Sequence, residues 1–438
     1  MLHSLQLGNL QLLVDDESQG ALGTALKQLQ LSGCQLLDGA TGAALVAALS
    51  HLPGLEHLSL RYIDGFTLPT AVLQQQLTYL ELDCVDVVGP DDGYDPDYHM
   101  LGSLALQPLQ SLTRLADLRV MSVSERGDLG GLKVRITPNM LSGMHYLTRL
   151  ELQEVFAEPS ILAGRTSLQH LSMTFDVFVS DARAEATQVL YHMQRLQQLT
   201  HLELTHSYWV QRGDLPPAAA YSALTASSKL QHLDISRSTL PPDAWKHVFP
   251  TGRMRPHLRS LDISWATEEC SSKHAFPPDG SRLVSCCPGL QSLDMQGLQH
   301  NAELLAPLQG LSALTTLRLI IQYAAYKVID GPEKKTLDVL CQMTRLRELG
   351  LGQTQWHGVS RASKEALFSR LVQLTQLTRL TRLTWMDPFG GGGHICPGRE
   401  DNSSLTSQVR FRQYCFSHNA DMIWAINGGL QVDKLFTS

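Results

Sequence analysis

The chain has 438 residues, of which 43% are hydrophobic and 18% are charged, and its formal net charge is -7. A mildly acidic chain without a basic block is not expected to bind nucleic acid, whose phosphates attract Lys and Arg. No apolar run approaches the roughly 20 residues that a membrane-spanning helix requires, so we expect no membrane span. No signal peptide is recognisable and the eight cysteines are scattered. We therefore expect a reduced, cytoplasmic location, with the nucleus or the axoneme as alternatives.

A short pattern, leucine-x-x-leucine-x-apolar, recurs along most of the chain. In LQHLDIS, Leu233 and Ile235 alternate with polar residues, which predicts a short strand with one buried face. The mean spacing from Leu2 to Leu380 is about 29 residues, which is typical of repeats that stack into one continuous core. The units begin at Leu2, Leu26, Leu55, Leu77, Leu115, Leu147, Leu168, Leu199, Leu230, Leu258, Leu290, Leu314, Leu346 and Leu380.

Helical patterns separate some of these predicted strands, at residues 180–196, 331–343 and 360–374. Pro332 lies near the first turn of the second segment, and Ser360 is placed to cap the third. A strand, a crossover and another strand at this spacing predict parallel strands whose connections lie on one side of the sheet.

The repeated units resemble the leucine-rich repeat family. This resemblance covers roughly residues 2–388. It implies an α/β solenoid, shaped as a curved horseshoe, with a concave parallel sheet and helices or irregular segments on the convex side. LKQLQLSGC, at 26–34, fits the cysteine-containing intracellular type, and the long period is similar to ribonuclease-inhibitor-like or F-box-linked arrays. Tracts such as LQSLTRLADLRV resemble plant- and algal-type arrays.

Three segments are predicted from these patterns. Residues 1–388 form a solenoid of about 14 units, 389–404 a glycine-rich linker, and 405–438 a tail that contains aromatic residues. The tail lacks the leucine pattern, and we expect either a cap on the last unit or a disordered segment. Within the solenoid, VVGPDDGYDPDYHM at 87–100 predicts an exposed acidic loop. A calcium loop is the alternative, but the expected glutamate is missing.

Two polar columns are predicted on the concave side of the sheet, because side chains alternate along a strand. The position between the two buried apolar residues carries carboxylates in consecutive units, and the position two residues earlier carries histidines. We expect these columns, with nearby aromatic anchors, to bind a partner; a solvated face or a metal site are the alternatives. The predicted binding residues are His170, Phe175, His201, Glu203, His232, Asp234, Asp262, Trp265 and Asp294, and Tyr208 and Trp209 are further anchors.

The sequence contains none of the common catalytic signatures, such as Gly-x-Ser-x-Gly or His-Glu-x-x-His. We therefore expect no catalytic, cofactor or metal site, and the resemblance implies a non-enzymatic protein-interaction module. Because aligned carboxylates repel one another, the expected partner is a protein with a basic patch. Two alternatives follow from the resemblance. One is the substrate receptor of an SCF-type ubiquitin ligase, with its F-box missing or supplied elsewhere, and the other is a scaffold of a cytoskeletal or ciliary axoneme assembly.

Overall fold

The computed structural model describes residues 3–8, 11–12, 26–33, 35–36, 49, 52–66, 76–87, 104–121, 124–125, 132–153, 155–174, 182–205, 215–268, 280–296, 305–321, 332–353, 377, 379–386, 408–410, 422–427 and 431–436. The chain divides into two compact units, Met1–Leu230 and Gln231–Ser438, and each is described by itself.

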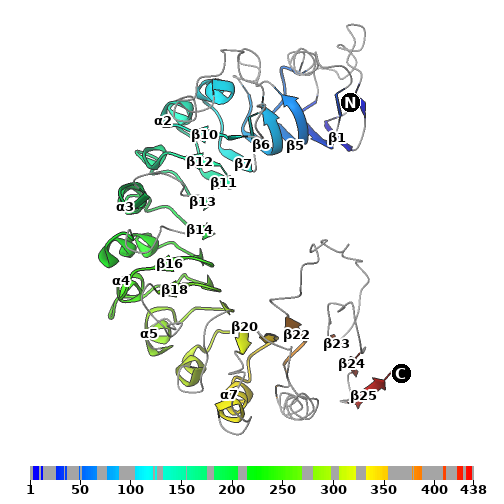
Figure 1. Ribbon diagram of the computed structural model, residues 1–438, viewed down its shortest axis with the longest axis vertical. Coiled ribbons are helices and arrows are strands. Elements are labelled where there is room, and N and C mark those ends of the chain that lie inside the picture. Colours follow the sequence, from blue (N-terminus) through cyan, green and yellow to red (C-terminus); the bar gives the residue numbers. More distant parts are fainter. Residues whose placement is uncertain are drawn as a thin grey trace. The chain divides into compact units, whose positions relative to one another are not determined.

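The first unit is built on parallel strands that pair in the order in which they occur in the chain (Figure 1). Neighbouring strands align the same repeat position, so that Leu58 lies beside Leu80 and Leu118 beside Leu150. The strands are β1 (Ser4–Gly8), β3 (Gln28–Ser32), β5 (His57–Phe66), β6 (Tyr79–Val87), β7 (Asp117–Met121), β11 (Arg149–Gln153), β13 (His170–Thr174) and β14 (His201–Thr205).

The second unit repeats this arrangement. Its parallel strands again pair in chain order, and Leu261 lies between Leu233 and Leu293 in the register. The strands are β15 (His232–Asp234), β17 (Ser260–Asp262), β19 (Ser292–Met295), β20 (Thr316–Ile321), β21 (Glu348–Gln353) and β22 (Arg382–Met386).

Short helices connect many of these strands, and in each unit they lie on one side of the sheet (Figure 1). Helices α3 and α7 fall within the predicted segments 180–196 and 331–343, which confirms both predictions; segment 360–374 lies outside the described residues. The first unit contains η4 (Leu104–Ser111), α2 (Pro138–Leu141), η5 (Pro159–Leu162), α3 (Ala182–Met193) and η6 (Ala218–Thr225). The second contains α4 (Ala244–Val248), α5 (Gly280–Cys286), η7 (Ala306–Gly310) and α7 (Pro332–Cys341).

Minor strands accompany the main sheets. In the first unit, the parallel pairs β2–β4 and β10–β12 form, and β8 pairs with β6 and β9; in the second, β16 pairs with β18. Their bounds are β2 (Gln11–Leu12), β4 (Gln35–Leu36), β8 (Ser124–Glu125), β9 (Leu132–Lys133), β10 (Arg135–Ile136), β12 (Phe156–Ala157), β16 (Thr239–Leu240) and β18 (Thr267–Glu268).

A threonine hydroxyl just before the strand joins successive repeats. Thr148 Oγ1 donates a hydrogen bond to Ala116 O at 3.1 Å, one repeat earlier, and Thr200 Oγ1 donates to Gln169 O at 3.0 Å. In the second unit, Thr315 donates in the same way to Gln291 O at 3.2 Å. The recurring Leu-Thr pair in the sequence therefore places a buried leucine next to a hydroxyl that satisfies a main-chain carbonyl at the sheet edge.

The repeated leucines form the core. Leu233 and Ile235 are 0% and 1% exposed, as their alternation predicts, and each buried aliphatic side chain stabilises the fold by about 1.5–3 kcal/mol. Leu5, on the first described strand, is only half-buried. Aligned parallel strands, one-sided connections and a leucine core make each unit a stack of leucine-rich repeats, so the expected solenoid fold is confirmed.

The tail contains a different sheet. Strands β23 (Gln408–Arg410), β24 (Met422–Asn427) and β25 (Gln431–Phe436) pair antiparallel within the second unit, and β23 approaches β22. The predicted linker at 389–404 lies outside the described residues, as does the predicted acidic loop beyond Val87.

Candidate binding face

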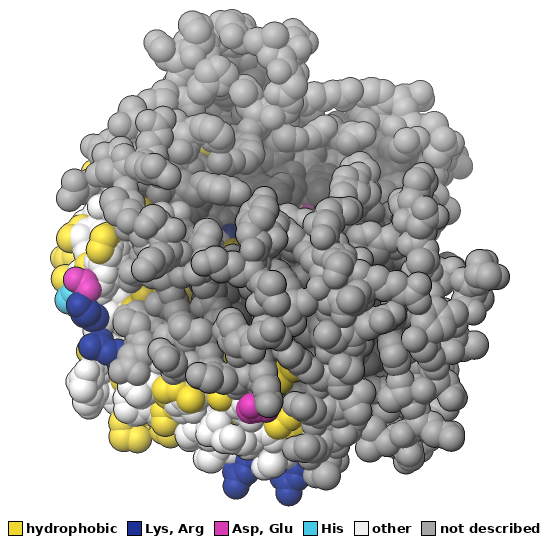
Figure 2. Space-filling view, turned by 60° about the horizontal axis from the view of Figure 1, so that its bottom comes forward, with side chains coloured by type: hydrophobic (Ala, Val, Ile, Leu, Met, Phe, Trp, Pro, Cys, Tyr) yellow, Lys and Arg dark blue, Asp and Glu magenta, His cyan; other side chains and the backbone are white. Residues whose placement is uncertain are grey.

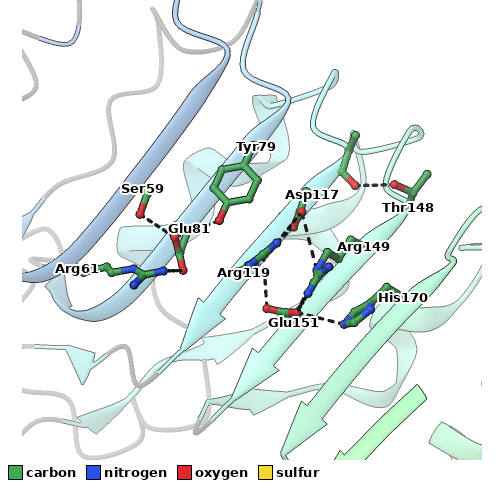
Figure 3. Close-up of polar contacts among 11 residues, drawn as sticks. Ser59, Arg61, Tyr79, Glu81, Asp117, Arg119, Thr148, Arg149, Glu151 and His170 are labelled. Carbon is green, nitrogen blue, oxygen red and sulfur yellow. Dashed lines mark hydrogen bonds and ion pairs between the residues drawn. The ribbon is translucent and has the colours of Figure 1, made fainter. Parts of the chain in front are cut away.

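Polar side chains cover the sheet face opposite the buried leucines, which we call the polar face. In the first unit the strand register aligns two columns of them, and Figure 3 shows their central part. The first column is His57, Tyr79, Asp117, Arg149, His170 and His201, and the second is Ser59, Glu81, Arg119, Glu151, Ser172 and Glu203. Opposite charges alternate between the central strands, as Glu81, Arg119 and Glu151 do in the second column.

The contacting polar residues drawn in Figure 3 form what we call the charged cluster, and the buried carboxylate of Glu81 lies at one end of it. Arg61 Nη2 donates a hydrogen bond to its Oε1 at 2.7 Å, while Ser59 Oγ and Tyr79 OH donate to its Oε2 at 2.7 and 3.0 Å. Burial acts to raise the pKa of Glu81, but these hydrogen bonds and the Arg61 charge outweigh burial and lower the pKa. Glu81 is therefore ionised at neutral pH although only 2% of it is exposed.

Arg119 connects this end of the cluster with the next carboxylates. Its Nε and Nη2 donate to the two oxygens of Asp117 at 3.2 Å each, and its Nε lies 3.5 Å from Glu151 Oε2. The guanidinium carbon lies 5.1 Å from the centre of the Tyr79 ring, a cation–π arrangement. Burial, followed by the Glu81 charge, raises the pKa of Tyr79 to about 12, so the phenol keeps its proton.

Glu151 is the second buried carboxylate. Arg149 donates to Glu151 Oε1 from Nε at 3.0 Å and also from Nη2, and His170 Nε2 lies 3.1 Å from the same oxygen. Burial acts to raise the pKa of Glu151, but the contact with His170, the Arg149 hydrogen bonds and the charges of Arg119 and Arg149 lower it to about 2. Removing one partner would leave the buried charge with less compensation, so we expect the residues of the cluster to depend on one another.

Stacked rings continue the first column. The His170 and His201 rings lie 5.3 Å apart at an interplanar angle of 29°, and the His57 and Tyr79 rings lie 5.7 Å apart at 27°. Thr200 Oγ1 also lies 2.9 Å from His201 Nδ1, in a hydrogen bond whose direction depends on the His201 tautomer.

The polar face of the second unit carries an aspartate column, Asp234, Asp262 and Asp294, aligned by the strand register. Each carboxylate Oδ1 accepts a hydrogen bond from the main-chain N–H two residues later, at 2.8, 2.9 and 3.2 Å respectively. The donors are Ser236, Ser264 and Gln296. Each aspartate is therefore held in a local turn at the strand end, in an Asp-x-Ser sequence at Asp234 and Asp262 and in an Asp-x-Gln sequence at Asp294.

The aspartates also raise one another's pKa. Burial, followed by the Asp234 charge, raises the pKa of Asp262, and burial with the Asp262 charge raises that of Asp294 to about 6. Gln296 Nε2 donates to Asp294 Oδ2 at 3.0 Å, and Arg318 Nη1 lies 3.5 Å from the same oxygen. These contacts offset burial and repulsion only in part, since the pKa of Asp294 stays above its usual value.

Two residues beside this column have left-handed backbone. Arg237 and Trp265 have φ angles of 58° and 60° and donate their N–H groups to Ser264 O and Gln296 O at 2.7 and 2.6 Å. Such conformations cost about 1–3 kcal/mol for a residue with a side chain and persist only where the surroundings impose them. The half-buried Trp265 is thus held at the end of β17, close in sequence to Asp262.

The structure aligns some of the predicted site residues with one another. His170 and His201 lie side by side in the first unit, as do Asp234, Asp262 and Asp294 in the second. Glu203 is half-buried on β14 and His232 is half-buried on β15. Phe175 lies outside the described residues, as do Tyr208 and Trp209.

The prediction from sequence missed most of the charged cluster of the first unit, namely Arg61, Tyr79, Glu81, Asp117, Arg119, Arg149 and Glu151. A usable signal was present, because Asp-Leu-Arg at 117–119 and Arg-Leu-Glu at 149–151 place opposite charges on one face of successive strands. Among the described residues, no three His, Cys, Asp or Glu side chains are grouped so that they could hold a metal ion. Of the helices in the described part of the chain, none has the length and apolar character needed to cross a membrane.

No protein-family model and no curated protein sequence matches this chain. Among solved structures, a leucine-rich repeat protein of Leptospira interrogans is similar with 15% identity and a TM-score of 0.40, over 85% of this chain and 94% of that one. TLR13, in a complex with ssRNA13, is similar with 15% identity and a TM-score of 0.41; the match covers 88% of this chain and 56% of TLR13. The chain thus spans little more than half the length of TLR13. The leucine-rich repeat fold assigned above rests on this chain's own register and burial.

Proposed function

We propose that the chain is a non-enzymatic module that binds a protein partner on the polar face of its repeats, and that the aspartate column receives basic side chains of this partner. The observation that carries the proposal is the alignment of three carboxylates in the strand register, where burial, followed by the charge of the neighbouring aspartate, raises the pKa of Asp262 and brings that of Asp294 to about 6. A Lys or Arg side chain placed between them would relieve the repulsion that exists in the free protein, and this relief would contribute to the binding free energy.

Trp265 supports a basic partner for a second reason. Its position at the end of β17 places an aromatic side chain close in sequence to Asp262, and an indole face attracts cations. Tryptophan is also among the residues most enriched at the energetic centres of protein interfaces. A partner with a basic residue beside an apolar one fits this pairing of carboxylate and indole.

A protein is a better partner than a nucleic acid for this surface. Aspartates repel phosphates, and the formal net charge of the chain is -7. In the view of Figure 2, the few coloured Lys and Arg side chains lie at the rim among apolar and neutral ones. Cys286 and Cys287 are buried thiols, which supports a reducing, cytoplasmic location as part of the proposal. No contact among the described residues favours the ubiquitin-ligase or axonemal role, and both stay predictions of the resemblance.

The test uses the full chain and a short poly-L-lysine peptide as the probe. Replacing the three aspartates (Asp234→Asn, Asp262→Asn and Asp294→Asn) removes the charges but keeps an oxygen that can accept the hydrogen bonds from Ser236, Ser264 and Gln296. We expect the Kd for the peptide to rise at least about tenfold. The matched control is Asp338→Asn, an exposed aspartate on α7. Equal affinity of the triple variant and the control, with unchanged circular dichroism, would contradict the proposal.

A further inference from the structure

The carboxylates in the first unit's polar cluster are already occupied by donors of the chain itself. Glu81 accepts three hydrogen bonds, both oxygens of Asp117 bind Arg119 at 3.2 Å, and Glu151 is held by Arg149 with His170 at 3.1 Å. The exposed fractions of the Glu81, Glu151 and Asp117 side chains are 3%, 10% and 22%. These groups have little capacity left to accept a hydrogen bond from a partner.

The arginines of the same cluster retain donors. A guanidinium carries five N–H groups, and Arg119 and Arg149 engage their Nε and Nη2 atoms. Within the described part of the chain, the Nη1 group of each meets no acceptor. Their side chains are 24% and 34% exposed, and they lie on the adjacent strands β7 and β11, about 4.8 Å apart. The surface therefore offers donors rather than acceptors.

We propose that Arg119 and Arg149 bind Asp or Glu side chains of an acidic protein segment. A carboxylate presents two oxygens that match the planar fork of a guanidinium, and such pairs are strong and directional at short range. Arg61 is a weaker candidate because Asp83 lies beside it in the register and adds negative charge.

Charge balance favours a protein carboxylate over a nucleic acid. The two arginines of the proposed site, Arg119 and Arg149, face Asp117 and Glu151, so this part of the cluster is formally neutral when the histidines are uncharged. Binding to a polyphosphate depends on a net positive field and on the release of counterions. A neutral cluster with exposed N–H groups instead selects a ligand by short-range geometry.

The internal ion pairs also prepare this surface for binding. An arginine side chain loses rotamer freedom when it is immobilised, which opposes binding. Asp117 and the Tyr79 ring already hold Arg119, and Glu151 holds Arg149, so most of this cost is met before the partner arrives. Arginine and tyrosine are also enriched among the residues that dominate interface energetics.

This site is independent of the aspartate column. It lies wholly in the first unit and prefers an acidic ligand, while the column lies in the second unit and prefers a basic one. Failure of one proposal therefore leaves the other standing, and the two can be tested separately on the same full-length chain.

The experiment measures binding of a short poly-L-glutamate peptide to the full chain by fluorescence anisotropy. The double variant Arg119→Lys with Arg149→Lys keeps the positive charges opposite Asp117 and Glu151 but removes the guanidinium forks. We expect its Kd for poly-L-glutamate to rise at least about tenfold. Arg259→Lys, at an exposed position of the second unit, is the matched control and should bind like the parent. The triple aspartate variant should also retain poly-L-glutamate binding.

Two results would overturn the inference. One is an equal affinity for poly-L-glutamate in the double variant, the parent and the control, and the other is absence of binding to the parent. A single-stranded DNA oligonucleotide that bound as tightly as poly-L-glutamate would replace the carboxylate proposal with general anion binding. If the double variant loses its circular dichroism signal, Arg149→Lys alone is compared with the control under the same criterion.

Discussion

His170 lies on the strand next to that of Glu151, and its Nε2 atom is 3.1 Å from the Oε1 atom of Glu151. Arg149 donates to the same oxygen from within the Glu151 strand. A single buried carboxylate is therefore held both by its own strand and by the next repeat, and its ionisation is coupled to the pairing of the two strands.

This coupling predicts a pH-dependent contribution to stability. The pKa of Glu151 is lowered from 4.5 to about 2, so the folded state favours the ionised form. The resulting stabilisation is fully present above about pH 4.5 and is lost as the pH falls towards about 2. We expect Glu151→Gln to lower the free energy of unfolding by about 1–3 kcal/mol at neutral pH, and by progressively less in acid.

Urea unfolding at a series of pH values measures this effect. Glu158→Gln is the matched control, because Glu158 forms one ion pair with Arg135 at 3.3 Å and its side chain is 30% exposed. We expect Glu158→Gln to lower the free energy of unfolding by less than about 1 kcal/mol. A Glu151→Gln variant whose deficit is the same at all pH values would refute the electrostatic explanation.

The ionisation of Asp294 has the opposite effect on the pH dependence of stability. Its pKa is raised from 3.8 to about 6, so the folded state favours the protonated form and loses stability as the pH rises between these values. We expect Asp294→Asn to increase the free energy of unfolding by about 1–2 kcal/mol at neutral pH. Near pH 4 the variant and the parent should have similar stability. A variant less stable than the parent at neutral pH would show that the Asp294 charge is stabilising.

The same titration predicts how binding to the aspartate column depends on pH. Asp294 is faced by Asp262 and Arg318, and His232 lies on the Asp234 strand. As the pH falls through about 6, Asp294 becomes neutral, and the column loses part of its attraction for a basic ligand. We expect poly-L-lysine binding to weaken on acidification. Anisotropy titrations on both sides of this pH would show constant affinity if the column were not the binding site.

The leucine core predicts an ordered series of destabilisations. Leu233 is 0% exposed, and Leu233→Ala should lower the free energy of unfolding by about 2–5 kcal/mol through lost burial and a residual cavity. Leu5 is half-buried on the first described strand, so Leu5→Ala should lower the free energy of unfolding by less than Leu233→Ala. Denaturant midpoints measured by circular dichroism provide the comparison. Equal effects at the two positions would be inconsistent with stacked repeats.

The tail prediction concerns residues 405–438. Their strand β23 approaches β22, the last described strand of the parallel sheet. If the tail caps this edge, its deletion exposes unpaired strand groups and promotes association. We therefore expect analytical ultracentrifugation to detect larger species in the truncated chain. A monodisperse truncated chain with an unchanged melting temperature would indicate that the tail does not protect the sheet.

The sequence by itself determined the repeat and the direction of its apolar side chains. Alternation at Leu233 and Ile235 predicts one buried face, and the recurrence of the pattern predicts a stack, because a single unit cannot bury its own leucines. The aspartate column was also predictable, since equivalent positions of successive repeats align when every strand has the same register. These inferences need only local periodicity and the assumption of parallel pairing.

Only the tertiary structure decided what the polar side chains do. Glu151 and His170 are separated in the chain by an entire connection, so their contact depends on the register of β11 and β13 and on the rotamers chosen there. In the same way, the sequence shows that Asp262 is polar but not that its carboxylate accepts the Ser264 N–H while repelling Asp234. Apolar burial follows from a pattern because it is non-directional, whereas hydrogen bonds and pKa shifts depend on distances and angles that exist only once the strands are paired.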